Sequence, residues 1–392
     1  MEDVVISSAV RTPMGGFQGD LDSFSASELG GKAIQGAMEK VGIDRVDEVI
    51  MGNVLGAGQG QAPARQASFA AGLDETVPAT TLNKMCGSGM KAAMIGFDQI
   101  KLGQSQTLAV GGMESMSNAP YLLPKMRSGA RLGHGKVVDH MFLDGLEDAY
   151  EPGRLMGTFA EDCAEKYQFT REAQDEYALT SLENSLSAQK VGAFENEIRA
   201  VEVTDRNGAK SSVLFDEQPQ NARPDKIPHL KPAFRKNGTV TPANSSSISD
   251  GAAALILASK SYSENEGLPI RARILGHSSY AHAPGLFTTA PVYAVKNLLK
   301  SIDWSIEMVD LWEVNEAFAV VPMAFMQELD ISRKILNVHG GACAIGHPIG
   351  ASGARIMVTL LNALERYDLK RGVAAVCIGG GEGTAIAIER AQ

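Results

Sequence analysis

Three side chains that could carry nucleophilic or proton-transfer chemistry lie in glycine-rich turns. Cys86 is followed by Gly-Ser-Gly, His347 lies within a glycine-rich run at residues 339–353, and Cys377 stands two residues before three consecutive glycines. Glycine adopts backbone angles that other residues avoid and lets a ligand approach the main chain. Because a nucleophilic cysteine needs a base, the sequence predicts Cys86 as the nucleophile and His347 as its base.

The position of Cys86 also predicts its reactivity. Met90, Ala93, Met94 and Phe97 follow helical spacing, so a helix is expected to begin just after the cysteine. The unpaired N–H groups and the dipole at a helix N-terminus favour a thiolate, which predicts a lowered pKa and an exposed sulfur. A histidine in a glycine-rich loop is structural as often as it is catalytic. The cysteine in a similar glycine-rich turn favours the catalytic interpretation of His347.

Cys377 indicates a second proton-handling group. One thiolate can hold an acyl group while a second cysteine moves a proton to or from carbon. The backbone N–H groups of Cys86 and of residues 379–381 would then form an oxyanion hole. The alternative for Cys377 is a small buried hydrophobe, which is the interpretation that we keep for Cys163 and Cys343.

The elements that position these turns alternate between strand and helix. Residues 4–10 form an apolar run typical of a buried strand, and residues 48–54 form a second one. Ser25 and Glu28 form a capping box that predicts a helix to about Lys40. This alternation predicts an α/β fold with a mostly parallel sheet covered on both faces.

The two cysteine turns belong to a repeated pattern. A Ser-Gly pair opens a helix at residues 88–89, 23 residues before the Gly-Gly pair at 111–112. A second Ser-Gly pair at residues 352–353 lies 27 residues before the Gly-Gly pair at 379–380. We expect an internal duplication, in which the strand near residues 273–275 corresponds to the first strand of the chain. Chance similarity of two such units is the alternative.

Residues 116–247 differ in composition from the rest of the chain. They are rich in proline, glycine and polar residues, which predicts an inserted loop domain. One helix is expected there, from Arg171 to Lys190. Residues 221–240 carry five basic residues against the single acid Asp225. That segment fits a phosphate-bearing ligand, and a solvated surface explains it equally well.

Two later stretches bear on the site. Residues 249–257 form another apolar run typical of a buried strand. We expect this strand to belong with the N-terminal half, which makes the first domain discontinuous. Residues 309–319 predict a strand, a turn and a helix, with Asn315 at the turn. A helix N-cap is the ordinary explanation of an asparagine in that place.

Composition excludes several classes of protein. The net charge is −10, from 36 basic and 46 acidic residues, which argues against nucleic-acid binding. No apolar run approaches the ~20 residues of a membrane span, and no signal peptide is visible. The four cysteines lie far apart without a C-x-x-C motif, so neither disulfides nor a metal site is predicted. A reducing, cytoplasmic setting fits this pattern.

These motifs together resemble the thiolase family. The resemblance runs over essentially the whole chain and is closest to the biosynthetic branch, the acetyl-CoA acetyltransferases. The motifs that carry it lie at residues 83–92, 111–117, 315–319, 337–355 and 377–384.

The resemblance implies a mechanism. Thiolases interconvert two acyl-CoA molecules with a 3-ketoacyl-CoA and free CoA. Cys86 would be the acylated nucleophile, activated by His347, and Cys377 would remove a proton from C2 of the second acetyl-CoA. Asn315, through a water, and His347 would stabilise the enolate, and the N–H groups of Cys86 and Gly379 would hold the oxyanion. CoA is implied as a substrate and product, with no permanently bound cofactor and no metal.

The resemblance also implies a five-layered α-β-α-β-α fold of two similar halves. The expected boundaries are residues 1–115 plus 248–267 for the first half, 116–247 for an inserted loop domain and 268–392 for the second half. CoA would lie against the loop domain. The residues expected to contact CoA or the acyl group are Met156, Arg223, Phe234, Ser246, Phe287, Ala317 and Phe318.

Several positions depart from the family pattern. Leu155 replaces a histidine common in biosynthetic members, and Gln220 falls near a nucleotide-contacting arginine, with Arg223 as its substitute. Phe287 replaces a methionine near the acyl pocket. These three changes leave the acyl-chain preference open, whereas His339 and Cys343 replace commoner residues without touching the implied mechanism.

Three interpretations of the function therefore remain. The first is an acetyl-CoA acetyltransferase, and the second is a degradative 3-ketoacyl-CoA thiolase of broader chain length. The third is a non-catalytic acyl-CoA- or lipid-binding relative, which should have lost Cys86, His347 or Cys377. Family members are dimers or tetramers. Residues 122–138 resemble the loop that joins dimers, which favours a homotetramer.

Overall fold

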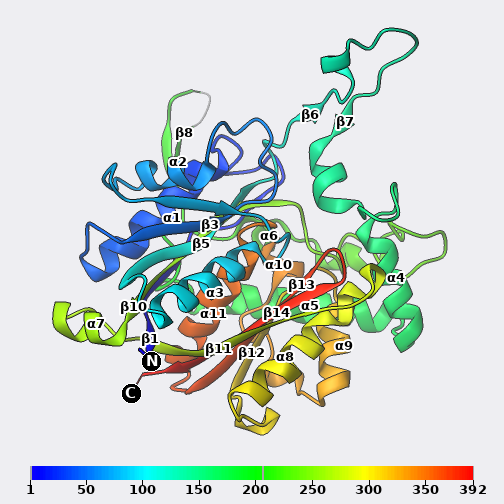
Figure 1. The fold of residues 1–392 in the computed structure, drawn as a ribbon. Helices are drawn as coiled ribbons and strands as arrows, with labels where there is room; N and C mark the ends of the chain where they lie inside the picture. Colours follow the sequence, from blue (N-terminus) through cyan, green and yellow to red (C-terminus); the bar gives the residue numbers. More distant parts are fainter. Residues whose placement is uncertain (1, 205–206, 392) are drawn as a thin grey trace.

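The computed structural model describes residues 2–204 and 207–391, and its first half is a mixed sheet with helices on both faces (Figure 1). Its elements are β1 (Val4–Arg11), β2 (Gly15–Gly16), α1 (Ala26–Val41), β3 (Glu48–Gly52), α2 (Pro63–Ala70), β4 (Ala79–Leu82), α3 (Ser88–Lys101), β5 (Thr107–Ser115), β10 (Ser249–Ser259) and α7 (Lys260–Glu266). The strands lie in the order β4-β3-β5-β10-β1. β3 is parallel to β4 and β5, whereas β10 is antiparallel to β5 and β1.

The second half repeats this arrangement. Its elements are β11 (Ala272–Ala281), α8 (Ala290–Ser301), β12 (Leu311–Val314), α9 (Val320–Leu329), α10 (Ala342–Ile345), α11 (Ser352–Arg366), β13 (Arg371–Ile378) and β14 (Glu382–Arg390). The order β12-β13-β14-β11 matches β3-β5-β10-β1 strand for strand, in pairing direction as well. β1 and β11 pair with each other and join the two sheets. The repeated Ser-Gly and Gly-Gly pairs therefore mark a structural repeat.

The prediction of a mostly parallel sheet is wrong. Antiparallel pairs form on both sides of β10 and of β14. The turn from β13 to β14 has positive φ at Gly380 (93°) and Gly381 (85°). So short a turn can join only antiparallel neighbours, because a parallel connection needs a crossover of a dozen residues or more. In the first half, the strand that follows the insertion, β10, returns in the same antiparallel sense.

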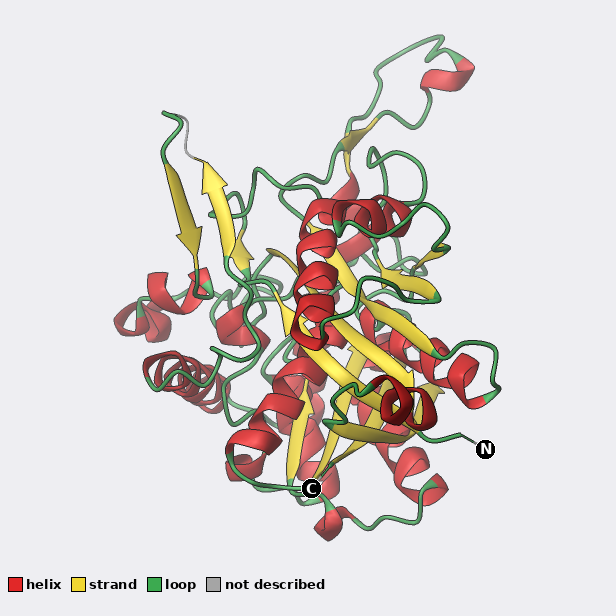
Figure 2. Cartoon of the chain, turned by 90° about the vertical axis from the view of Figure 1, so that its left-hand side faces the viewer, coloured by secondary structure: helices red, strands yellow, loops and turns green. Residues whose placement is uncertain are grey.

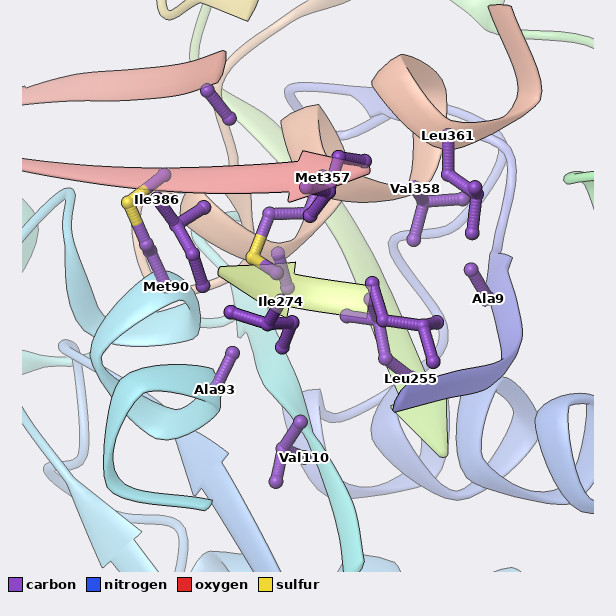
Figure 3. Packing of buried hydrophobic residues seen from close by; sticks show 14 of the residues in the cluster. Ala9, Met90, Ala93, Val110, Leu255, Ile274, Met357, Val358, Leu361 and Ile386 are labelled. Carbon is purple, nitrogen blue, oxygen red and sulfur yellow. The ribbon is translucent and has the colours of Figure 1, made fainter. Parts of the chain in front are cut away.

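The helices and the two sheets form five layers. α1 and α2 contact the first sheet on its outer face, and α8 contacts the second on its outer face, with α9 beside it. α3 and α11 lie between the sheets, and α11 contacts strands of both halves. Figure 3 shows this interior, where Met90 of α3 and Met357 of α11 lie close to Ile274 and Ile386 of the second sheet.

The two central helices approach each other through glycine. A Cβ added to Gly89 would lie 2.7 Å from the backbone nitrogen of Ala354, and one added to Gly353 would lie 2.5 Å from that of Met90. Side chains at these two positions would therefore push the helix N-termini apart. Because the Cys86 turn precedes α3 and the His347 turn precedes α11, this close approach brings both turns to one place.

The segment between β5 and β10 contains its own helices and hairpins. These elements are β6 (Tyr121–Leu122), β7 (Val138–Asp139), α4 (Met156–Tyr167), α5 (Arg171–Lys190), β8 (Val201–Thr204), β9 (Lys210–Val213) and α6 (Glu217–Asn221). The chain between β6 and β7 forms an arm that projects from the body, and the β8–β9 hairpin also extends outward (Figures 1 and 2). The residues at which the halves and the insertion divide remain a prediction.

Local sequence signals predicted several elements well. Ser25 and Glu28 form both hydrogen bonds of the capping box at the start of α1, and α5 has the predicted bounds. Within the described residues, the structure contains no helix that is long and apolar enough to span a membrane.

Candidate active site

A cavity of about 690 Å³ opens where the N-termini of the two central helices meet the inserted segment. Its wall is mainly apolar, with backbone polar groups and a few side chains from both halves. The predicted residues that line it are Cys86, Met156, Phe234, Ser246, Phe287, Ala317, Phe318, His347 and Gly379.

Three predicted residues do not line this cavity. Cys377 and Asn315 are fully buried behind its wall. Arg223 is exposed at the start of a short 3-10 helix, Pro224–His229. A contact between Arg223 and a bound molecule would therefore have to form outside the cavity.

Cys86 sits in a tight turn before α3. Met85 has a left-handed backbone with φ of 47°, and Ser88 closes the turn. The hydroxyl of Ser88 donates to the Met85 carbonyl oxygen (2.6 Å) and accepts from the Lys84 N–H (2.8 Å). These bonds fix the backbone that presents the Cys86 sulfur to the cavity.

The predicted low pKa of Cys86 is wrong. Burial raises the pKa of the Cys86 thiol to about 11, although the N–H groups of Gly379 and of Cys86 itself act in the opposite direction. Desolvation of the charged form thus outweighs the helix N-terminus. Cys86 is a neutral thiol at neutral pH and needs a base. The two N–H groups that face the sulfur are the pair predicted to form the oxyanion hole.

His347 is held as a neutral imidazole. Its backbone N–H faces the Ser247 carbonyl oxygen (3.1 Å) and the Ser249 hydroxyl (3.2 Å). Burial, and then the positive charge of Arg355, lower the pKa of His347 to about 3. The ring therefore carries no charge at neutral pH and has one nitrogen free to accept a proton.

Ser352 determines which nitrogen that is. Its hydroxyl donates to the Pro348 carbonyl oxygen (3.0 Å), so it accepts from Nδ1–H of His347 at 2.5 Å. Nε2 of His347 has no hydrogen-bond partner among the described residues. Nε2 is thus the basic nitrogen, in the ring that lines the cavity with Cys86.

Cys377 lies at the end of β13, inside an apolar cluster that includes Phe287, Phe318 and Cys163. Burial, and then the neighbouring Cys86, raise the pKa of Cys377 well above its usual value. The N–H of Ala317 faces its sulfur and partly opposes this rise. The effect of Cys86 on the Cys377 pKa indicates that the two side chains interact electrostatically.

Asn315 follows β12 and is not a helix N-cap, which corrects the ordinary explanation of its position. Helix α9 begins five residues later, with Ala319 at its N-cap. The backbone N–H of Asn315 donates to the Ala375 carbonyl oxygen (3.0 Å), but its buried amide oxygen and nitrogen find no partner within the described parts of the chain. A buried amide left in this state can bind a water or a ligand.

Aromatic side chains form one wall of the cavity. Phe318 meets Phe234 edge to face at 5.9 Å and Phe287 at 6.4 Å between ring centroids. Phe234 packs over Gly157, where an added Cβ would lie 2.4 Å from the ring. The backbone N–H of Ser246 donates to the Ala317 carbonyl oxygen (2.9 Å) and ties the inserted segment to the loop after β12.

Sequence reasoning missed much of the opposite wall. It is built from residues 142–150, which begin with a π-helical turn, Phe142–Leu146, and from Met85, Ile248 and Ile349. Met85 and Ile349 lie in motifs given above, but no motif marks residues 142–150 or Ile248, because their proximity depends on how the insertion folds back. Across residues 2–204 and 207–391, no group of three or more His, Cys, Asp and Glu side chains could hold a metal ion.

Comparison with known proteins shows the family of this chain. Residues 4–261 match the family "Thiolase, N-terminal domain", and residues 268–390 match "Thiolase, C-terminal domain". The chain belongs to the thiolase family. A probable acetyl-CoA acetyltransferase of Dictyostelium discoideum is 49% identical over 392 residues, which cover 100% of this chain and 94% of that protein.

Solved thiolase structures share the fold over the whole length. The acetyl-CoA acetyltransferase of Bacillus anthracis superposes with a TM-score of 0.96 at 40% identity and covers 100% of this chain and 99% of its own. A thiolase of Ascaris suum in complex with coenzyme A gives 0.93 at 42% identity, with 99% and 100% covered.

We expect removal of the Ser352 hydroxyl to weaken the base of this thiolase. Ser352→Ala leaves Nδ1–H of His347 without its acceptor, so the ring loses its fixed tautomer. The turnover number should fall about tenfold, a fraction of the 10²–10⁴ that a positioned base contributes. Steady-state thiolysis kinetics measure this. Ser263→Ala, which removes a buried hydroxyl from α7, is the control. Equal turnover in the two variants would contradict the role of Ser352.

Proposed function

We propose that this thiolase is an acetyl-CoA C-acetyltransferase, which reversibly condenses two acetyl-CoA molecules to acetoacetyl-CoA and CoA through an acyl-enzyme on Cys86. One observation carries this proposal. The turn of one half presents a thiol to the same cavity that receives a neutral histidine and a glycine N–H from the other half. Relatives at close to half identity are named acetyl-CoA acetyltransferases.

In the first step, the Cys86 sulfur attacks the thioester carbonyl carbon of acetyl-CoA. Nε2 of His347 takes the thiol proton, and the N–H groups of Cys86 and Gly379 hold the oxyanion of the tetrahedral intermediate. The C–S bond to CoA then breaks. The leaving CoA thiolate takes the proton of Cys377, which leaves an acetylated Cys86, an imidazolium and a Cys377 thiolate.

In the second step, the Cys377 thiolate removes a proton from C2 of another acetyl-CoA. Its raised pKa makes that thiolate a strong base. The imidazolium of His347 and a water held by Asn315 stabilise the enolate oxygen. The enolate carbon attacks the acetyl group and displaces the Cys86 thiolate, which recovers its proton from His347. Each side chain ends in its starting state.

CoA is a substrate and product of this reaction rather than a resident cofactor, and a similar thiolase of Ascaris suum is known in complex with it. We propose that Met156, Ser246, Ala317 and the aromatic wall contact the pantetheine and acyl parts, because these residues line the cavity. Arg223 would meet the nucleotide outside it. Arg235 is already paired with Asp162 and Glu165, so it is less free to do so.

We further propose a cytoplasmic homotetramer that acts in fatty acid metabolism. The arm between β6 and β7 supports the assembly, because it projects from the body of the chain (Figure 1) and carries exposed apolar side chains. In this arm Leu132 is 98% exposed, and Val137 is 65% exposed. Contact between the arms of neighbouring subunits would remove these side chains from water.

The proposal predicts a preference for short acyl chains. Thiolysis of acetoacetyl-CoA should have a kcat/KM about tenfold or more above that of a longer 3-ketoacyl-CoA, since each methylene that the pocket rejects costs about this much. Phe287 and Phe318 form the wall that extra methylenes would meet. Equal or higher efficiency on the long chain would instead support a degradative 3-ketoacyl-CoA thiolase. Loss of activity on both would support a binding protein. A Cys86→Ala chain serves as the blank.

A further inference from the structure

Glu114 is a fully buried carboxylate that the mechanism above does not use. It lies near the end of β5, in the first half, and its side chain reaches two loops. Oε1 accepts from the Asn53 side-chain amide (2.8 Å) and from the Leu55 N–H (3.1 Å). Oε2 accepts from the N–H groups of Val54 (3.0 Å) and Gly350 (2.9 Å).

The bond to Gly350 connects Glu114 to the catalytic histidine. Gly350 ends the turn that begins at His347, and its neighbour Ile349 lines the cavity. The turn is therefore tethered at both ends, at His347 by Ser247 and Ser249 and at Gly350 by Glu114. One carboxylate of the first half thus fixes a loop of the second half.

The fit around this bond is close. A Cβ added to Gly350 would lie 2.7 Å from Oε2 of Glu114 and 2.8 Å from the Met113 carbonyl oxygen. A Cβ added to Gly112 would lie 2.0 Å from the Gly350 carbonyl oxygen. The histidine turn therefore rests directly on β5, and any movement of Glu114 must move the turn.

The asparagine that follows the matching strand makes different contacts in the two halves. Asn53 follows β3 as Asn315 follows β12, in the two strands that match in the repeat. The side-chain amide of Asn53 donates to Glu114, whereas the Asn315 amide has no partner in the described parts of the chain. Asn53 thus supports the site through Glu114, whereas the amide of Asn315 remains available to bind a water or a ligand.

We propose that Glu114 is the positioning residue that holds the His347 turn against the Cys86 turn, and that its carboxylate acts on the Cys86 sulfur across the cluster of Val54, Leu55 and Ile349 against which Cys86 packs. This inference rests on the proposed roles of Cys86 and His347. The titratable groups around Cys86 are Glu114 on β5, His347 before α11 and Cys377 on β13, and Asp250 on β10 faces Glu114.

Electrostatics support the second part of this proposal. The negative charge of Glu114 raises the pKa of Cys86, after the larger effect of burial. Burial also raises the pKa of Glu114 to about 7, opposed by its backbone N–H partners Leu55, Val54 and Gly350. At pH 8.5 the carboxylate is therefore charged, so replacing it should make the Cys86 thiolate easier to form.

The test is Glu114→Gln, which keeps the shape, removes the charge and turns one acceptor into a donor facing N–H groups. Turnover in thiolysis should fall about 10- to 100-fold with KM within about twofold, because the base is misplaced while substrate contacts remain. Alkylation of Cys86 by iodoacetamide at pH 8.5 should become about threefold faster, because a gain in thiolate exceeds the loss of nucleophilicity. Because partial unfolding would also expose Cys86 and speed its alkylation, the two rates are compared only if Glu114→Gln keeps the melting temperature of the unaltered protein.

Asp250→Asn is the matched control, because it removes a buried carboxylate that makes no bond to the histidine turn. It should match the unaltered protein in turnover and alkylation. Asn53→Ala removes one donor and keeps the charge, so it tests the proposal if Glu114→Gln fails to fold. Its turnover should fall about threefold without faster alkylation. Unchanged turnover in both variants, or unchanged alkylation in Glu114→Gln, overturns the proposal. Alkylation is measured without turnover. Its result therefore tests the role of Glu114 separately from the proposed reaction.

Discussion

Replacing Cys86 with serine should abolish the acyl-enzyme. A serine hydroxyl is far less acidic than a thiol and its oxygen is a weaker nucleophile, so His347 activates it much less than it activates Cys86. Turnover should fall about 10⁴-fold or more, as for other nucleophile deletions. Intact-protein mass spectrometry after incubation with acetyl-CoA should show one added acetyl group on the unaltered chain and none on Cys86→Ser.

Cys343→Ser is the matched control for that measurement. Cys343 is another unpaired cysteine, and its thiol donates to the backbone oxygen of Glu316 at 3.7 Å. A serine can keep that contact, so acetylation should proceed normally. An acetyl group that still appears on Cys86→Ser, or that disappears in Cys343→Ser, would contradict Cys86 as the acylated residue.

Replacing Cys377 with serine should separate the two steps of the reaction. Cys86 and His347 remain in place, and the CoA thiolate is a good leaving group that can depart without the Cys377 proton, so acetylation should proceed within a few-fold of the unaltered rate. Condensation should fall about 10³-fold, because the base that removes the C2 proton is missing and its serine substitute does not ionise. The smaller oxygen still faces the Ala317 N–H, so the buried site keeps its hydrogen bond.

Two measurements distinguish these steps. Burst acetylation of Cys86 reports the first step, and exchange of the acetyl-CoA C2 protons with deuterium from solvent reports the second. The Cys377→Ser chain should show the burst and no exchange. Cys163→Ser, in the same apolar cluster, should show both. Undiminished exchange in Cys377→Ser would assign the carbon base to another residue, and loss of the burst would mean that CoA cannot leave without the Cys377 proton.

Local patterns were sufficient to place the helices and the candidate chemistry. The capping box of Ser25 and Glu28 acts within one helical turn, so its outcome depends little on the rest of the chain. The turns of Cys86 and His347 are likewise built by nearby bonds, to Ser88 and Ser352 respectively. Both residues therefore appear in the cavity where their motifs predicted a site.

Three predictions failed where long-range structure decides. The direction of β10 and β14 depends on which strands they meet, which spacing does not contain. The pKa of Cys86 depends on how much water the folded chain removes, and burial proved stronger than the helix end. Asn315 looked like a cap because the length of the turn before α9 is not visible in its neighbours.

The sequence by itself thus determined the residue types, the repeat and the turns that carry Cys86, His347 and Cys377. Only the tertiary structure decided that these turns meet. It does so because Gly89 and Gly353 let two buried helices touch, and because Glu114 reaches across the repeat to Gly350. Such contacts join residues more than two hundred positions apart. Their energy comes from burial and hydrogen bonds that no local segment can form alone.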